Sequence, residues 1–199
     1  MTKVVAIMSM SLDGYVADAN DGVAEVFDWY FSGDVSLPTA STTSGMTFHV
    51  SAPSADLGLQ SSQVVGAMLT GRRTFERADG RGGRHPWDVP AFVLTHNVPD
   101  GWPRPGSTVQ FVTDGIESAV ARAKSAAGPK SVGVHGARTI QQCLDAGLLD
   151  EIHIDLAAVL LGSGVRLFDH LANTPAVLGN PTVVTGVGVT HLRYPVPTS

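Results

Sequence analysis

Residues 131–164 carry the strongest structural signal in the chain and read SVGVHGARTIQQCLDAGLLDEIHIDLAAVLLGSG. The β-branched run at 131–134 predicts a buried strand, and the apolar spacing over 137–146 predicts a helix. Gly147 ends that helix, and alternating polar and apolar residues then predict a long strand over 150–161. Strand, helix and strand in this order indicate a parallel β-α-β unit.

The same pattern extends in both directions from this unit. Short apolar runs predict further strands at 4–10, 64–70, 91–95 and 108–112, and the Val- and Thr-rich tail at 182–196 predicts two more. Helices are expected to begin at Arg72 and to cover 116–127. We therefore predict an α/β fold of three layers. It has a mostly parallel central sheet, helices on both faces and a C-terminal antiparallel hairpin.

A polar segment interrupts this alternation at about 18–62. It is rich in Gly, Ser, Thr, Asp and Pro, and it contains the aromatic cluster Phe27, Trp29, Tyr30 and Phe31. We predict a long loop within a single domain spanning 1–199, with a short helix starting near Pro53. Loops of this length in compact domains are usually functional or mobile.

Composition and charge exclude several function classes. The net charge of −5 is not accompanied by any strip of Lys and Arg, which argues against nucleic acid and anionic membrane surfaces as partners. The seven histidines show no metal-ligand spacing, so no metal site is expected.

Neither the lone cysteine nor the N-terminus suggests an exported protein. Cys143, the single cysteine, lies in an apolar helical pattern that favours a buried core residue over a nucleophile. The apolar run at 4–8 is too short for a membrane span and has no cleavage site after it, so we expect a cytoplasmic protein.

Two strand-to-helix junctions are candidates for anion binding. One reads LTGRRT at 69–74 and the other VHGART at 134–139, and each places a glycine just before a helix. A helix N-terminus offers free N–H groups and a positive dipole end, and glycine lets a ligand approach the backbone. Tight turns also need glycine for geometry alone. The adjacent Arg72 and Arg73 favour a phosphate monoester at the first junction.

A third polar pattern lies in the strand predicted over 150–161. Glu151, His153 and Asp155 alternate with apolar residues, so their side chains share one face of the sheet. This face is either exposed to solvent or forms the polar wall of a pocket. We expect the solvent-exposed arrangement.

Four segments, taken in order, resemble the dihydrofolate reductase superfamily, and most closely the reductase domain of riboflavin biosynthesis. They read MSLDGYVA at 10–17, TGRRTFE at 70–76, FVLTH at 92–96, and GART through AGLLDE to VLLGSG between 136 and 164. The resemblance covers the chain from residue 4 to about 168. It implies a dihydrofolate reductase-like fold, a homodimer, and NADPH as hydride donor.

The resemblance also implies roles for individual residues. Those expected around the adenosine 2′-phosphate are Arg72, Arg73, Thr95 and His96. Those expected at the pyrophosphate are Thr74, Gly136, Ala137, Arg138 and Thr139. Those expected near the nicotinamide are Ser9, Val16 and Ala17. Gly71, His135 and Gly162 are expected to bind the cofactor as well. The family often has two glycines joined by a cis peptide where this chain has His135-Gly136, and we expect that peptide to be cis here.

The substrate-side carboxylate is not fixed by the resemblance. Asp13, Asp56 and Asp155 are rival candidates for it. We expect an NADPH-dependent reductase of a nitrogen heterocycle, most like 5-amino-6-(5-phosphoribosylamino)uracil reductase. The alternative is a non-catalytic nucleotide-binding or regulatory module on the same fold.

Overall fold

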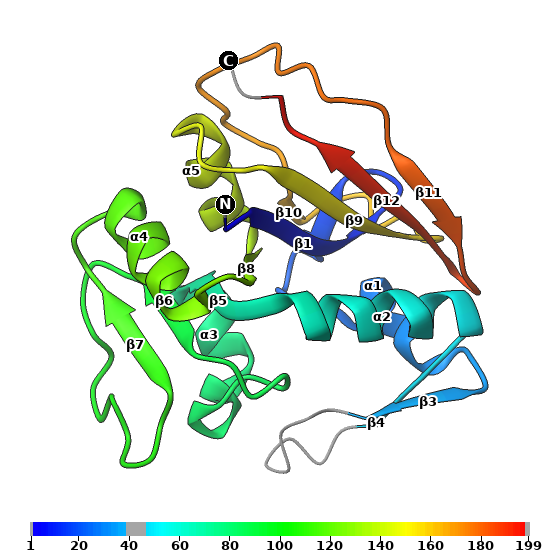
Figure 1. Ribbon diagram of the computed structural model, residues 1–199. Coiled ribbons are helices and arrows are strands. Elements are labelled where there is room, and N and C mark those ends of the chain that lie inside the picture. The colour runs from blue at the N-terminus through cyan, green and yellow to red at the C-terminus, as the bar shows by residue number, and fades with distance from the viewer. Residues whose placement is uncertain (1, 39–46, 198–199) are drawn as a thin grey trace.

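A twisted eight-stranded sheet forms the centre of the computed structural model, which describes residues 2–38 and 47–197 (Figure 1). In sheet order the strands are β11 (Thr182–Thr185), β12 (Val189–Pro195), β9 (Glu151–Ala157), β1 (Val4–Ser11), β8 (Ser131–His135), β5 (Val65–Gly71), β6 (Ala91–Leu94) and β7 (Val109–Val112). All pairs from β9 to β7 are parallel, whereas β12 runs antiparallel to β9 and β11. The predicted fold class and tail hairpin are confirmed.

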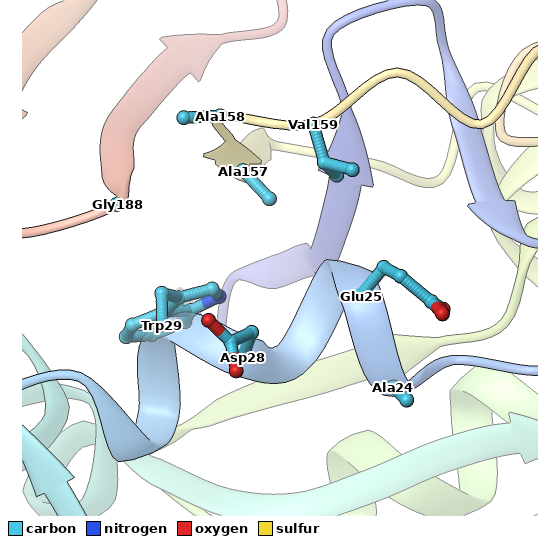
Figure 2. A pocket seen from close by; sticks show the side chains of 8 residues that line it. All are labelled: Ala24, Glu25, Asp28, Trp29, Ala157, Ala158, Val159 and Gly188. Carbon is cyan, nitrogen blue, oxygen red and sulfur yellow. The ribbon is translucent and has the colours of Figure 1, made fainter.

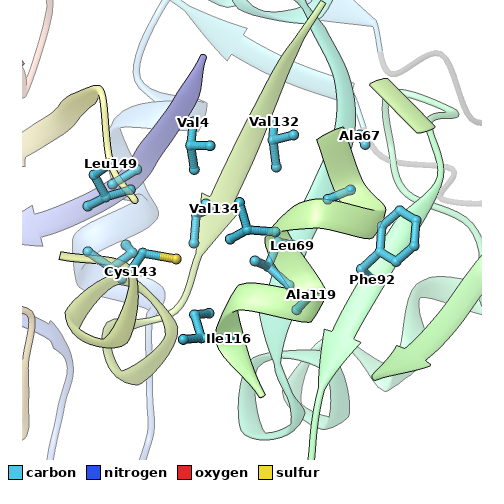
Figure 3. Close-up of a cluster of buried hydrophobic side chains, with 14 of the residues drawn as sticks. Val4, Ala67, Leu69, Phe92, Ile116, Ala119, Val132, Val134, Cys143 and Leu149 are labelled. Carbon is cyan, nitrogen blue, oxygen red and sulfur yellow. The ribbon is translucent and has the colours of Figure 1, made fainter. Parts of the chain in front are cut away.

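One face of the sheet is covered by α4 (Ile116–Ala127) and α5 (Ala137–Asp145), close to the two helices predicted there. Between sheet and helices lies the main core, part of which Figure 3 shows, including Val4, Leu69, Val134 and Cys143. Cys143 is fully buried, and this burial raises the pKa of its thiol to about 12. Its burial confirms the prediction of a core cysteine. A thiol with so high a pKa forms almost no thiolate, which argues against a nucleophile.

The opposite face carries the other helices of the described chain. They are α1 (Ala24–Phe27), η1 (Asp28–Phe31), α2 (Ala52–Val64), α3 (Arg72–Arg77) and η2 (Asp79–Gly83). In Figure 1, α2 crosses beneath the strands at the β11–β9 side, and α3 lies under β5 and β6. No helix in the described part of the chain is long and apolar enough to cross a membrane.

The polar segment 18–62 is not one long loop over its described residues. It holds α1, η1, most of α2, and the hairpin of β3 (Val35–Pro38) and β4 (Thr47–Val50), while 39–46 lie outside the described residues. The elements form because a few apolar side chains, Trp29, Val50 and Ala55 among them, pack as a second core against Ala157 and Val189. The helix expected near Pro53 is α2.

Two local differences shape the edge where the strands end. Strand β9 stops at Ala157 instead of continuing to 161, and the chain turns directly after it, with Val159 N–H donating to Ala157 O. Farther on, Leu161 N–H and Gly162 N–H donate to the Asp13 carboxylate. A small ladder joins β2 (Tyr15–Ala17) to β10 (Val165–Arg166) and has no counterpart among the predicted strands. Both features tie the segment after β1 to the segment after β9.

Candidate functional site

The two strand-to-helix junctions lie side by side at the carboxyl edge of the sheet. Thr70 near the end of β5 is paired in register with His135 at the end of β8. On the other side of β5, Gly71 is paired with Leu94, so Thr95 and His96 follow beside the α3 junction. The parallel register thus brings together junctions that lie far apart in the sequence. Three strand ends meet at one edge, the usual ligand crevice of such sheets.

At each junction, the space left by the missing Cβ of the glycine is occupied by a threonine side chain of the other junction. Gly136 has φ of +90°, which disfavours any side chain, and a Cβ there would lie 2.5 Å from Thr74 Oγ1. A Cβ at Gly71 would lie 2.8 Å from Thr139 Oγ1. The starts of α3 and α5 therefore pack closely against each other through these glycines, and we call Gly71, Thr74, Gly136 and Thr139 the glycine cradle.

The cradle has the groups that an anion needs. Helix α5 has nine residues, and its first intrahelical bond runs from Ile140 N–H to Gly136 O, so the N–H groups of Ala137, Arg138 and Thr139 have no partner within the helix. Within the described residues, the buried Thr70 Oγ1 also lacks a hydrogen-bond partner. A pyrophosphate would supply acceptors for the three N–H groups at the start of α5, so the residues present fit a dinucleotide.

The basic side chains at the start of α3 are already paired. Arg72 Nε donates to Glu76 Oε1 at 2.7 Å, and Arg73 donates twice to Asp21 from the segment after β2. Both arginines remain largely exposed, with 45% and 68% of their side chains accessible. Exposed ion pairs of this kind are worth about 0–1 kcal/mol, so they do not hold the guanidinium groups against a doubly charged phosphate.

The three residues expected near the nicotinamide have buried side chains. Ser9 accepts a hydrogen bond from Trp29 Nε1 at 3.3 Å, while Val16 and Ala17 are buried in β2. Gly162, also expected to bind the cofactor, is exposed, and its N–H donates to Asp13 at 2.7 Å. All four lie near the ends of β1 and β9, at the same edge of the sheet as the cradle.

The expectation of a cis peptide at His135-Gly136 is wrong. Among the described residues the cis peptides precede Pro103 and Pro175. A trans bond suffices here because Gly136 alone provides the sharp turn through its positive φ.

A narrow pocket of about 120 Å³ lies on the α2 face of the sheet. Its polar wall comes from β9 and β12 and includes His153, Asp155 and His191. Aromatic side chains from η1 and β4, Tyr30 and Phe48, line it from the other side, with their ring centroids 4.8 Å apart. A pocket with flat apolar walls and a hydrogen-bonding edge suits a small planar heterocycle.

The three rival carboxylates have different surroundings. Asp13 accepts hydrogen bonds from Ser11 Oγ, Leu161 N and Gly162 N, and the Ser11 bond above all lowers the pKa of Asp13 to about 2. Asp56 is exposed on α2 and lines neither pocket. Asp155 lines the narrow pocket, with 19% of its side chain accessible. Asp155 is therefore the one rival that faces a heterocycle-sized space.

The expectation that Glu151, His153 and Asp155 face solvent is wrong. Helix α2 covers this face of the sheet, and burial lowers the pKa of His153, partly offset by its 2.8 Å hydrogen bond to Glu151. Burial alone would raise the pKa of Glu151, but hydrogen bonds from Lys3 and His153 hold it below its usual range. The alternation of polar and apolar residues correctly predicted that the three side chains share one face of β9, but it did not predict that α2 covers that face.

A second pocket, of about 420 Å³, opens beyond the end of β9 (Figure 2). Ala157, Ala158 and Val159 form one side and α1 and η1 the other, with the carboxylates of Glu25 and Asp28 as its polar groups. Trp29 lines both pockets, so its indole stands between them. The acidic lining does not suit a phosphate, which separates this pocket from the glycine cradle.

Sequence reasoning missed three residues of the narrow pocket. Ser54 and His191 lie next to Asp155, and Trp29 packs edge-on to the His191 ring with centroids 5.3 Å apart. The aromatic cluster at 27–31 was the available signal for Trp29. The sequence contains no signal for His191, because its position opposite Asp155 depends on the antiparallel register of β12 and β9.

The chain was compared with known families and structures. The RibD C-terminal domain family matches residues 2–193. A Shewanella sp. PV-4 protein assigned to riboflavin biosynthesis is 26% identical with a TM-score of 0.66, covering 99% of each chain.

Two more distant structures share the fold. A Thermotoga maritima diaminohydroxyphosphoribosylaminopyrimidine deaminase/5-amino-6-(5-phosphoribosylamino)uracil reductase is 13% identical (TM-score 0.61), with 98% of this chain and 57% of that one covered. Enterococcus faecalis dihydrofolate reductase, complexed with NADP(H), is 16% identical (TM-score 0.58), with 97% and 95% covered. The fold is thus dihydrofolate reductase-like, and the chain belongs to the RibD C-terminal domain family.

Proposed function

We propose that this protein is an NADPH-dependent reductase of a nitrogen heterocycle, most like a 5-amino-6-(5-phosphoribosylamino)uracil reductase. The observation behind the proposal is the glycine cradle at the start of α5, on the same sheet as a pocket that holds Asp155. The Thermotoga relative is named for this reductase activity, and the Enterococcus relative is complexed with NADP(H).

The cradle residues hold the dinucleotide in this proposal. The N–H groups of Ala137, Arg138 and Thr139 bind the pyrophosphate, with the α5 dipole behind them. Arg72 and Arg73, beside Thr95 and His96, bind the 2′-phosphate. When bound, NADPH supplies the hydride; the chain itself orients the two reactants and excludes water.

Removing both arginines is expected to change cofactor preference. Each guanidinium–phosphate bond is worth about 1.5–3 kcal/mol, so Arg72→Ala combined with Arg73→Ala should weaken NADPH binding tenfold or more. NADH has no 2′-phosphate, and its affinity should barely change. Titration of both cofactors by nucleotide fluorescence measures this, and Arg122→Ala, which breaks an exposed ion pair with Asp114 at the start of α4, is the matched control. Equal weakening of NADPH and NADH would contradict the 2′-phosphate assignment.

The narrow pocket holds the heterocycle, with its ring against the aromatic wall formed by Tyr30 and Phe48. Asp155 reaches the edge of the ring from β9. Reduction of a C=N or C=O bond needs one proton besides the hydride, and a carboxyl group in a pocket is suited to give it. Asp13 is fully hydrogen-bonded and ionised, and Asp56 does not line the pocket, so neither fills this role.

The test is NADPH consumption with 5-amino-6-(5-phosphoribosylamino)uracil and related heterocycles. NADPH titration alone establishes binding, and the loss of absorbance of the reduced nicotinamide on adding substrate establishes turnover. Tight NADPH binding without turnover across the panel would favour a non-catalytic nucleotide-binding module. Absence of NADPH binding would contradict both.

We also propose that the protein is a homodimer formed through the edge strand β11. Val183 on β11 and Val187 in the turn after it are each 54% exposed, and β11 has no partner on its outer side within the described sheet. Such an edge favours pairing with a second copy. Light scattering at micromolar concentration should give a mass near twice 20.8 kDa, and Val183→Lys should shift it toward 20.8 kDa. Wild-type protein at the monomer mass would contradict the proposal.

A further inference from the structure

A chain of hydrogen bonds leads from the narrow pocket, through the buried Ser54–His191 pair, toward the β11–β12 turn. His191 Nδ1 lies 2.7 Å from Asp155 Oδ1, and His191 Nε2 lies 2.9 Å from Ser54 Oγ. Ser54 Oγ is in turn 2.9 Å from Ser51 Oγ, which accepts from Val187 N–H at 3.3 Å. The glycine cradle does not use this chain, nor does the packing of the main core.

The chain lies where three elements meet. Asp155 on β9 is paired in register with His191 on β12 and with Ser9 on β1, so the three side chains form one row across the sheet. Helix α2 places Ser54 above His191, and both residues are 4% exposed. Ser54, His191 and Asp155 all line the pocket, and Asp155 is the most accessible of the three, with 19% of its side chain exposed.

Val187 N–H can only donate, so Ser51 Oγ accepts from it. The directions of the other three hydrogen bonds depend on the orientation of the two hydroxyls and on the His191 tautomer. The arrangement that serves Asp155 has Ser51 donating to Ser54 and Ser54 donating to His191 Nε2, with the ring proton on Nδ1, facing the Asp155 oxygen.

Other charged and titratable groups near this row have different partners. His153 and Glu151 on β9 bind each other, and Arg193 follows on β12, paired in register with His153. Trp29 from η1 packs edge-on to His191 and donates to Ser9 on β1. Within residues 2–38 and 47–197, Asp155 is the only carboxylate within ion-pair distance of His191.

We propose that Ser54 and His191 are positioning residues for proton donation by Asp155, an inference that rests on the proposed reductase function. In the reduction of a C=N bond, hydride from NADPH forms the new C–H bond and the π electron pair moves to nitrogen. That nitrogen takes its proton from the Asp155 carboxyl, and solvent restores the proton after product leaves. His191 Nδ1–H stabilises the carboxylate as it forms, through a charge-assisted hydrogen bond.

Four variants of the full chain test this arrangement. His191→Leu removes the donor to Asp155, whereas His191→Gln retains an N–H that can reach it. Ser54→Ala leaves the ring in place but frees its tautomer. His170→Leu is the matched control, because His170 also lies beside an aspartate, Asp169, but its side chain is 75% exposed.

The activity measurement uses NADPH and 5-amino-6-(5-phosphoribosylamino)uracil. A hydrogen bond to a charged group is worth about 1.5–3 kcal/mol, so His191→Leu should lower kcat by about 10- to 100-fold with KM little changed. His191→Gln should recover part of that loss, Ser54→Ala should fall between, and His170→Leu should match wild type. Equal kcat values for His191→Leu and wild type, or no recovery by His191→Gln, would overturn the inference while leaving the reductase function standing.

A second measurement needs neither cofactor nor substrate. Imidazole nitrogen NMR of the ¹⁵N-labelled protein should show the His191 proton on Nδ1, and Ser54→Ala should move part of the population to Nε2. A proton on Nε2 in the wild-type protein would overturn the positioning role. Wild-type protein that turns over no heterocycle would overturn the proposed function, and with it the part of Asp155 in catalysis, whatever tautomer is found.

Discussion

Gly136→Val is expected to abolish measurable NADPH binding while the protein stays folded. Gly136 has φ of +90°. A Cβ added to it would lie 2.5 Å from Thr74 Oγ1, between the starts of α3 and α5. A branched side chain there must displace Thr74, and we expect this to disturb the two helix starts that bind the pyrophosphate in the proposed function. Loss of two hydrogen bonds to a charged group, at about 1.5 kcal/mol each, corresponds to a Kd at least about 100-fold higher.

The matched control separates this effect from backbone strain. Gly147, at the other end of α5, has φ of +65°, and a Cβ there would meet nothing within 4 Å. Gly147→Val should lose about 1–3 kcal/mol of stability from its positive φ alone, and Gly136→Val should lose more because its Cβ also meets Thr74. A domain stable by about 5–15 kcal/mol survives the first loss, and circular dichroism establishes whether it survives the second. Circular dichroism checks the fold and NADPH titration the site. Normal NADPH binding by a folded Gly136→Val variant would remove the cradle as a cofactor site.

The sheet and the cradle could be predicted because their signals are local. Short β-branched runs mark β1, β5, β6 and β8, and a glycine before each of two helices marks the junctions. Because the strands are parallel and each is followed by a helix, both junctions are expected at the same edge of the sheet, where the strands end. The same argument gave the tail hairpin, because the Val- and Thr-rich run has no helical period.

The narrow pocket could not be predicted, because its walls come from pairings between distant segments. The apolar residues of the segment 18–62 follow no single period, and several of them pack only once Ala157 and Val189 are placed beside them. Alternation in β9 likewise showed that Glu151, His153 and Asp155 share a face. Whether that face meets water or α2 is decided by tertiary packing, which a period of two does not encode.

Asp155→Asn is expected to reduce turnover far more than any change at the other two rival carboxylates. The amide oxygen of the new side chain can still accept the His191 Nδ1–H, so the row across β1, β9 and β12 is retained. An amide has no acidic proton to give, and a positioned acid contributes typically about 10²–10⁴-fold to a rate. We therefore expect kcat to fall by about that factor, with NADPH affinity unchanged because the cradle lies at the ends of β5 and β8.

Asp56→Asn and Asp13→Asn complete the comparison. Asp56 is exposed on α2 and its replacement should leave kcat within about twofold of wild type, as surface changes away from a site usually do. Asp13→Asn weakens the acceptor for Leu161 N–H and Gly162 N–H, so it should lower thermal stability more than kcat. Rates measured with saturating NADPH and 5-amino-6-(5-phosphoribosylamino)uracil distinguish the three. If Asp56→Asn or Asp13→Asn lost turnover while Asp155→Asn kept it, the narrow pocket would not be the place where the substrate is protonated.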